Sequence, residues 1–188
     1  MGGVRYLTSG ESHGQGLIGI IEGLPAGLEI SEEDIFEDLQ RRQMGHGRGG
    51  RMKIETDRAR FISGVRFGKT LGSPISLLIE NADWKNWTTK MSVSEVDEAV
   101  KVVEIPRPGH ADLAGIIKYR AGDIRDILER ASARETATRV ALGAMARKFL
   151  GKFGIKIVSH VTRIHTAESS FSVAMMRHDD KTDFTLEN

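Results

Sequence analysis

The chain has 188 residues, of which 39% are hydrophobic and 28% are charged, and its formal net charge at pH 7 is +1. This is the composition of an ordinary globular protein with one sizeable core, and the balanced charge argues against a nucleic-acid binder, whose basic excess is spread over a face. The absence of cysteine excludes disulfides and thiolate metal sites and is compatible with a reducing compartment. With no long apolar segment and no signal-peptide pattern, the sequence predicts a cytoplasmic protein without a membrane partner.

The first part of the chain predicts two strands and a helix. Val4–Ser9 and Leu17–Glu22 are rich in β-branched and apolar residues, and a polar turn, GESHGQG, separates them. Ser31 is a good helix N-cap, and the three acidic residues after it favour the positive end of a helix. We expect this helix to extend to about Arg42. Its apolar face would be formed by Ile35, Phe36 and Leu39.

The middle of the chain predicts two more strands, Phe61–Val65 and Ile75–Glu80, joined by turn residues. The polar segment that follows contains Trp84 and Trp87, which we interpret as a surface lid or an oligomer contact rather than a cofactor site. Ser94–Val102 is predicted to form a short helix.

The longest predicted element is a helix over Asp123–Phe153. Its centre, Val140–Ala146, has no polar side chain, and a helix that is apolar all round is buried on both sides. Ile155–Ile164 then alternates like a strand. The pattern predicts an α+β fold with a layer of sheet, a layer of helices and a further layer on the far side. The strands visible in the sequence can cover only one face of the helices.

The segment Gln40–Lys53 combines several arginines with four glycines and contains no acidic residue. Glycines let the backbone approach a ligand closely, and guanidinium groups match phosphate or carboxylate oxygens in pairs. The segment is therefore a candidate site for a small polyanion. The alternatives are a solvated basic loop or an arginine-glycine segment that binds nucleic acid.

Three further clusters carry groups that could do chemistry. The turn Gly10–Gly14 presents Ser12 and His13, although adjacent residues do not make a Ser–His hydrolase arrangement, and a surface histidine is the simpler interpretation. In the second cluster, a Pro-Gly turn precedes His110, and Asp112 is near enough to influence the charge of that histidine.

The third cluster is Glu129–Thr136. Arg130 and Arg134 are one helical turn apart and would face the same side. Taken alone, the cluster favours a pair of surface salt bridges with Glu129 and Glu135. Metal coordination is not expected, because His160 and His165 face opposite sides of a predicted strand without a carboxylate cluster. Neither nucleotide-binding fingerprint, GxGxxG after a strand or GxxxxGK[ST], is present.

Taken in order, these clusters resemble the chorismate synthase family. The matching segments are GESHG, RRQMGHGRGGRMKIE, SGVRFGKTLGSPI, RPGHADLAGIIKY and ERASARETATRVALGA, and the resemblance extends from Tyr6 to about Val161. It implies a shikimate-pathway lyase that converts 5-enolpyruvylshikimate 3-phosphate into chorismate and phosphate by a 1,4-elimination. It also implies reduced FMN as cofactor, NADPH as a candidate flavin reductant, and a cytoplasmic homotetramer. The implied fold is a β-α-β sandwich with long buried helices packed against antiparallel sheet, of which this chain would be half.

The resemblance also implies roles for single residues. His13 matches a catalytic histidine that protonates the departing phosphate and contacts the substrate, and His110 matches one that acts as an acid toward the flavin. Ser12 would support proton removal near the flavin. Residues implied in anion binding are Arg42 and Arg48, for substrate or NADP, and Arg134, for substrate. Residues implied at the flavin phosphate are Arg130, Ala131 and Ser132, where alanine replaces a more common serine but keeps the backbone N–H.

Members of that family are much longer than this chain. By resemblance, residues 1–188 form a single N-terminal domain of a truncated enzyme, and further FMN contacts, a substrate arginine and an aspartate tied to proton removal lie beyond it. We therefore expect the 188-residue chain by itself to be inactive. The alternative hypothesis, from a different class, is an inactive anion-binding or oligomerisation fragment that retains the fold.

Overall fold

The computed structural model describes residues 3–44 and 54–169. The chain divides into two compact units, residues 1–154 and 155–188. The first unit contains the sheet and the helices described next. No helix among the described residues is long and apolar enough to cross a membrane.

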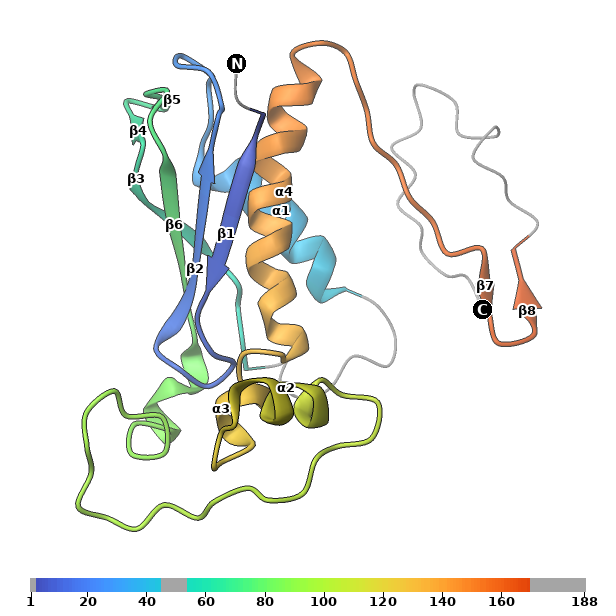
Figure 1. The fold of residues 1–188 in the computed structure, drawn as a ribbon. Coiled ribbons are helices and arrows are strands. Elements are labelled where there is room, and N and C mark those ends of the chain that lie inside the picture. Colours follow the sequence, from blue (N-terminus) through green and yellow to red (C-terminus); the bar gives the residue numbers. More distant parts are fainter. Residues whose placement is uncertain (1–2, 45–53, 170–188) are drawn as a thin grey trace. The chain divides into compact units, whose positions relative to one another are not determined.

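A four-stranded antiparallel sheet forms one layer of the first unit, in the order β1-β2-β6-β3 (Figure 1). Its strands are β1 (Arg5–Ser9), β2 (Gly16–Glu22), β6 (Ile75–Glu80) and β3 (Ala59–Ser63). The four strands predicted between Val4 and Glu80 are confirmed, with small shifts at their ends. Two short strands, β4 (Val65–Arg66) and β5 (Lys69–Thr70), form a separate hairpin.

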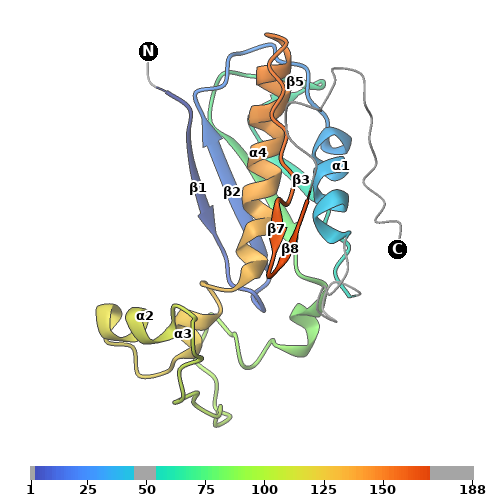
Figure 2. The same ribbon diagram turned by 90° about the vertical axis from the view of Figure 1, so that its right-hand side faces the viewer.

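Two helices, α1 (Glu32–Gln43) and α4 (Thr136–Gly151), pack side by side on one face of this sheet (Figure 2). Helix α1 begins where predicted, because Ser31 and Asp34 form a capping box that satisfies backbone N–H groups at the helix start. The apolar residues of the strands alternate toward the helices, and these contacts form the core. Members of the core that are almost fully buried include Leu17, Ile21, Ile35, Leu39, Ile75, Leu77, Ile79, Ala137, Ala141 and Met145. The predicted α+β class, with helices packed on antiparallel sheet, is confirmed.

The prediction of one continuous helix over Asp123–Phe153 is wrong. The segment contains α3 (Arg125–Leu128), the 3₁₀ turn η3 (Ala133–Glu135) and then α4. The helix is interrupted because Ser132 has an extended backbone, and its side chain accepts a hydrogen bond from the N–H of Arg134. In the centre of α4, Gly143 is exposed, so the described residues bury this apolar stretch on one side rather than on both.

Two further predicted elements are also wrong. Residues 94–102 form no helix; they are almost all exposed, and so short a helix needs an apolar face packed against a core. Residues 155–162 form no strand: they are largely exposed, and no strand within residues 3–44 and 54–169 pairs with them. The second unit instead contains a small hairpin of β7 (Arg163–Ile164) and β8 (Ala167–Glu168).

Two short helices complete the first unit. The 3₁₀ helix η2 (Ala82–Asn86) directly follows β6 and contains Trp84, with Trp87 at its C-cap. Helix α2 (Asp112–Tyr119) packs against α3 at Gly115, where an added Cβ would come within 2.2 Å of Ile127 Cγ2. Together, η2, α2 and α3 bring the predicted clusters to the end of the sheet at which β1 ends and β2 begins (Figure 1).

Candidate active site

The turn between β1 and β2 is the first component of the candidate site. It requires glycine at position 10, where φ is +103° and a Cβ would lie 2.3 Å from the carbonyl oxygen of Gly16. The turn contacts the segment that contains α3 and η3. The N–H of Ser12 donates to the backbone carbonyl of Glu129 at 3.0 Å, and Ser132 Oγ donates to Ser12 Oγ, also at 3.0 Å. The predicted residues Ser12 and Ser132 are thus in contact.

His13 is held by the same segment. Both its backbone N–H and its Nδ1 contact Glu129 Oε2, at 2.9 and 2.7 Å respectively. Its ring stacks on Trp87 with centroids 3.9 Å apart, and its Nε2 lies 3.9 Å from Asp83 Oδ2. Asp83 in turn accepts a hydrogen bond from the indole N–H of Trp87 at 3.0 Å. The imidazole therefore has a fixed plane and a fixed partner for one of its nitrogens.

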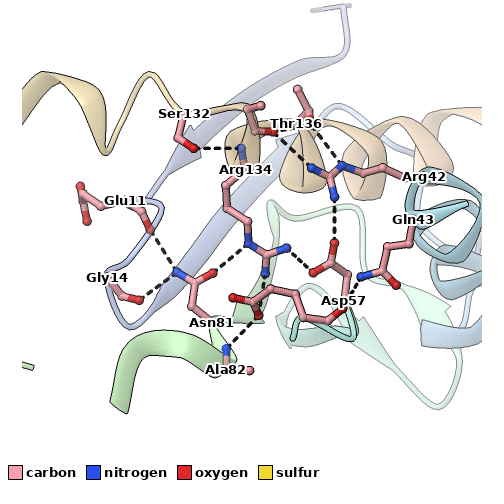
Figure 3. A network of polar contacts seen from close by, with 12 residues as sticks. Glu11, Gly14, Arg42, Gln43, Asp57, Asn81, Ala82, Ser132, Arg134 and Thr136 are labelled. Carbon is pink, nitrogen blue, oxygen red and sulfur yellow. Dashed lines mark hydrogen bonds and ion pairs between the residues drawn. The ribbon is translucent and has the colours of Figure 1, made fainter. Parts of the chain in front are cut away.

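Arg134 is at the centre of a buried polar network (Figure 3). Its side chain is 4% exposed, and its guanidinium contacts Asp57, Asn81 at 3.0 Å and Glu55 at 3.5 Å. Asn81 also donates to the carbonyl oxygens of Glu11 and Gly14, at 3.0 and 2.8 Å. The network therefore ties the turn of His13 to η3 and to the end of β6.

Arg42 joins this network from the end of α1. Its Nη1 lies 3.1 Å from Asp57 Oδ2, so Asp57 bridges the guanidinium groups of Arg42 and Arg134. Arg42 also donates to Thr136 Oγ1 at 3.1 Å and to the carbonyl oxygen of Ala133 at 3.2 Å. The structure thus brings together two predicted anion-binding arginines from distant parts of the chain. Arg48 and the glycine-rich part of its loop lie outside the described residues.

A hollow of about 250 Å³ lies beside these residues and is lined by Arg130, Ala131, Ser132, Glu135 and Arg139. Arg130 Nη2 donates to the carbonyl oxygen and the hydroxyl of Thr8, while its buried Nη1 makes no hydrogen bond and lies 3.8 Å from Glu135. Burial raises the pKa of Glu135, but hydrogen bonds from Thr8 and Arg139 outweigh burial, and the net pKa is lowered.

One expectation for this hollow is not met. The backbone N–H of Ala131, expected to be available to a flavin phosphate, donates instead to the carbonyl oxygen of Ile127 at 2.9 Å. The segment follows directly from α3, so its first N–H groups still complete helical hydrogen bonds. The guanidinium of Arg130 and the hydroxyl of Ser132 are therefore the better candidates for contact with an anion.

His110 is held in a cluster of its own at the start of α2. Its Nδ1 lies 2.5 Å from Asp112 Oδ1, and Nη2 of Arg107 lies 3.1 Å from both ring nitrogens. Hydrogen bonds from the Arg107 guanidinium are the main cause that lowers the pKa of Asp112 to about 2. The imidazole of His110 therefore lies between a buried carboxylate and a guanidinium group. The two predicted catalytic histidines thus depend on two different buried carboxylates.

A larger hollow, of about 390 Å³, lies between α1 and α4. Several charged residues at this hollow form ion pairs: Lys148 contacts Asp34 at 2.6 Å, and Arg147 contacts Asp38 at 2.7 Å. It contains none of the predicted site residues, and we therefore assign the candidate site to the cluster around His13. Within the described residues, no group of three or more potential ligands could hold a metal ion.

Several residues of the site escaped the sequence interpretation. The sequence offers Glu129 only as a partner in surface salt bridges and Trp87 only as part of a lid or an oligomer contact. It gives no prediction for the buried acids Glu55 and Asp57. The available signal was weak: two acids follow directly after a basic, glycine-rich loop, where they could neutralise its arginines. Only their positions in the fold reveal which groups they hold.

Comparison with known proteins gives one consistent match. The family model described as chorismate synthase matches residues 4–187. The chain is 57% identical to chorismate synthase of Chlorobium luteolum over 175 residues, which cover 93% of this chain and 44% of that protein. It is 61% identical to the Aquifex aeolicus protein of the same name over 166 residues, covering 88% and 42%. A crystal structure of chorismate synthase matches with a TM-score of 0.67 and 49% identity, covering 88% of this chain and 40% of that one. The chain thus spans less than half the length of these relatives.

Proposed function

The chain belongs to the chorismate synthase family, and from this premise we propose that it supplies part of the active site of a lyase that converts 5-enolpyruvylshikimate 3-phosphate into chorismate and phosphate. The observation that carries the proposal is the junction between the turn Gly10–Gly14 and the segment Glu129–Arg134. This junction joins a histidine suited to proton transfer to a hollow that contains an arginine and a serine suited to bind phosphate.

His13 would act as the acid for the departing phosphate. Its Nδ1 is occupied by Glu129, so Nε2 is the nitrogen at which a proton can be exchanged with a substrate. Trp87 stacks on the ring and limits its rotation. A leaving phosphate carries a growing negative charge, and a proton delivered from a fixed ring nitrogen stabilises that charge in the transition state.

The anionic groups of the substrate would be bound by Arg42 and Arg48. Arg42 lies at the end of α1, from which the chain continues into the glycine-rich segment. Arg134 lies behind Arg42 and is linked to it through Asp57. Because its guanidinium already contacts three side chains, a direct contact with substrate would require Arg134 to exchange one of them.

The residues around the hollow fit a phosphate group such as that of FMN. Arg130 offers a buried Nη1 that makes no hydrogen bond, and Ser132 offers a hydroxyl at the rim. Glu135 opposes an anion there, but Arg130, Arg139 and Thr8 surround it. When bound, reduced FMN would supply electron density transiently to the substrate. Ser12 would assist proton removal nearby, and His110, whose Nδ1 faces Asp112, would act as an acid toward the flavin.

The finer features of this proposal follow the family. We propose that the protein acts in the cytoplasm as a homotetramer, with FMN as its cofactor and NADPH as a candidate reductant of the flavin. Sedimentation velocity of the purified protein tests the tetramer, and anaerobic oxidation of NADPH in the presence of FMN tests the reductase activity.

The decisive test is an anaerobic assay of the protein expressed from its complete reading frame, with reduced FMN and 5-enolpyruvylshikimate 3-phosphate. We expect chorismate and inorganic phosphate in equal amounts. His13→Ala and His110→Ala should each lower the rate about 10²- to 10⁴-fold, the usual contribution of a general acid. Glu33→Gln, on the exposed face of α1, is the control and should keep the parental rate.

The outcomes separate the two hypotheses. Chorismate formation that depends on both histidines supports the lyase. Binding of FMN and substrate without any chorismate would overturn it and leave the alternative, an anion-binding module that retains the fold.

A further inference from the structure

The carboxylate of Glu129 lies 2.7 Å from Nδ1 of His13, and we propose that Glu129 is a positioning residue that fixes the tautomer and the orientation of this imidazole. The catalytic consequence of this inference rests on the proposed function, but the contact itself does not. Glu129 does not touch substrate in this proposal; it acts through His13.

The geometry of the contact is unusually restrictive. One oxygen, Glu129 Oε2, accepts hydrogen bonds from two atoms of His13, the backbone N–H at 2.9 Å and Nδ1 at 2.7 Å. The backbone bond locates the residue, and the ring bond then leaves a narrow range for the side-chain torsions. With Nδ1–H as the donor, Nε2 becomes the nitrogen that faces away from Glu129 and exchanges its proton.

Glu129 is itself held rigidly. Its side chain is 1% exposed, its second oxygen lies 3.5 Å from Nη1 of Arg125, and its backbone carbonyl accepts from the N–H of Ser12. The Arg125 guanidinium also lies over the Trp87 ring, 5.4 Å from the centroid. Glu129 and Trp87 therefore contact the imidazole directly, and Arg125 contacts both of them. A partner with this little freedom can hold a proton donor in a reactive orientation without the cost of ordering it in each turnover.

A purely structural role for Glu129, such as anchoring the turn to α3, would produce different effects in two conservative variants. Glu129→Asp keeps the charge and the pairing with Arg125 but withdraws the carboxylate by one methylene from Nδ1. Glu129→Gln removes the charge but keeps an acceptor oxygen at the same reach. If Glu129 positions His13, Glu129→Asp should therefore lower the rate more than Glu129→Gln. If Glu129 serves instead as a buried counter-charge, Glu129→Gln should lower the rate more.

The kinetic test uses the protein expressed from its complete reading frame. We expect Glu129→Asp to lower kcat about 10- to 100-fold with little change in KM, a part of the total that His13 can contribute. Glu129→Gln should stay within about fivefold of the parent. In a His13→Ala background, Glu129→Asp should cause no further loss, because a residue that acts only through His13 has nothing left to act on. Asp38→Asn removes a buried acid between α1 and α4 and controls for general destabilisation.

A second readout needs no activity. Diethyl pyrocarbonate acylates unprotonated histidine nitrogens, and peptide mass spectrometry gives the rate at His13 relative to the exposed His165. We expect faster acylation of His13 in Glu129→Asp than in the parent or in Glu129→Gln.

Equal acylation rates in all three proteins would overturn the inference, even if the parent forms chorismate. The inference would also be overturned if Glu129→Asp lowered kcat by the same factor in the parent and in the His13→Ala background. If the parent forms no chorismate, the proposed function fails, while the acylation order still decides whether Glu129 holds His13.

Discussion

Replacing Asp57 by asparagine should destabilise the protein more than removing the charge of any exposed residue, because Asp57 neutralises two arginines at once. Its side chain is fully buried and contacts Nη1 of both Arg42 and Arg134. Asparagine keeps the shape and one acceptor oxygen but removes the charge. Two largely buried guanidinium groups would then lose their shared counter-ion.

The magnitude follows from burial. Removing one partner of a buried ion pair costs about 3–5 kcal/mol, because the other charge stays in a low-dielectric surrounding. Glu55 remains 3.5 Å from Nη2 of Arg134 and offsets part of this loss, so we expect the lower end, about 3 kcal/mol. With a urea m-value of about 2 kcal/mol/M, the unfolding midpoint should fall by about 1.5 M.

The assay is equilibrium unfolding in urea, followed by circular dichroism, for the parent, Asp57→Asn and Glu33→Gln. Glu33 pairs with Arg58 at 3.7 Å, but the two side chains are 67% and 66% exposed, so its removal should cost less than about 1 kcal/mol. If the midpoint of Asp57→Asn shifts no more than that of Glu33→Gln, the buried network does not stabilise the fold as argued.

Three further predictions concern other parts of the fold. The pKa of Asp112 is about 2, against an ordinary value of 3.8. The ionised carboxylate therefore stabilises the folded state fully above about pH 4, and this stabilisation is lost as the pH falls toward 2. Asp112→Asn should remove this part of the acid dependence of the unfolding midpoint. An added Cβ at Gly19 would lie 2.8 Å from Thr138 Cγ2, so Gly19→Ala should separate β2 from α4 and lower the free energy of unfolding by about 1–3 kcal/mol, measured in urea. Ser31→Ala removes the acceptor of the α1 capping box and should cost about 1 kcal/mol in the same assay; an unchanged midpoint in either variant would contradict the corresponding contact.

Local sequence patterns were sufficient to predict those elements whose conformation is determined by residues close together in the sequence. The apolar segment Ile75–Glu80, bounded by turn residues, predicted β6 at its observed ends, and the cap at Ser31 predicted the start of α1. Both signals arise from chemistry between near neighbours: an apolar segment between turn residues and a side chain that accepts from a backbone N–H three residues on. The same kind of local reasoning failed at Ser132. The apolar pattern predicted a continuous helix there, but the Ser132 side chain accepts a hydrogen bond from the N–H of Arg134, and the helix is interrupted.

Motifs in the sequence also identified most residues of the candidate site, but not how they are held. His13 and Ser132 could be named from their segments, whereas Glu129, 116 positions from His13, could not be assigned to it. Asp57 likewise gains its meaning only where α1 and η3 place two guanidinium groups on its two oxygens. The sequence by itself therefore determined the four strands of the sheet, the capped helix α1 and the candidate side chains. The tertiary structure decided their partners, because a buried charge takes whichever opposite charge the packing of distant elements brings within reach.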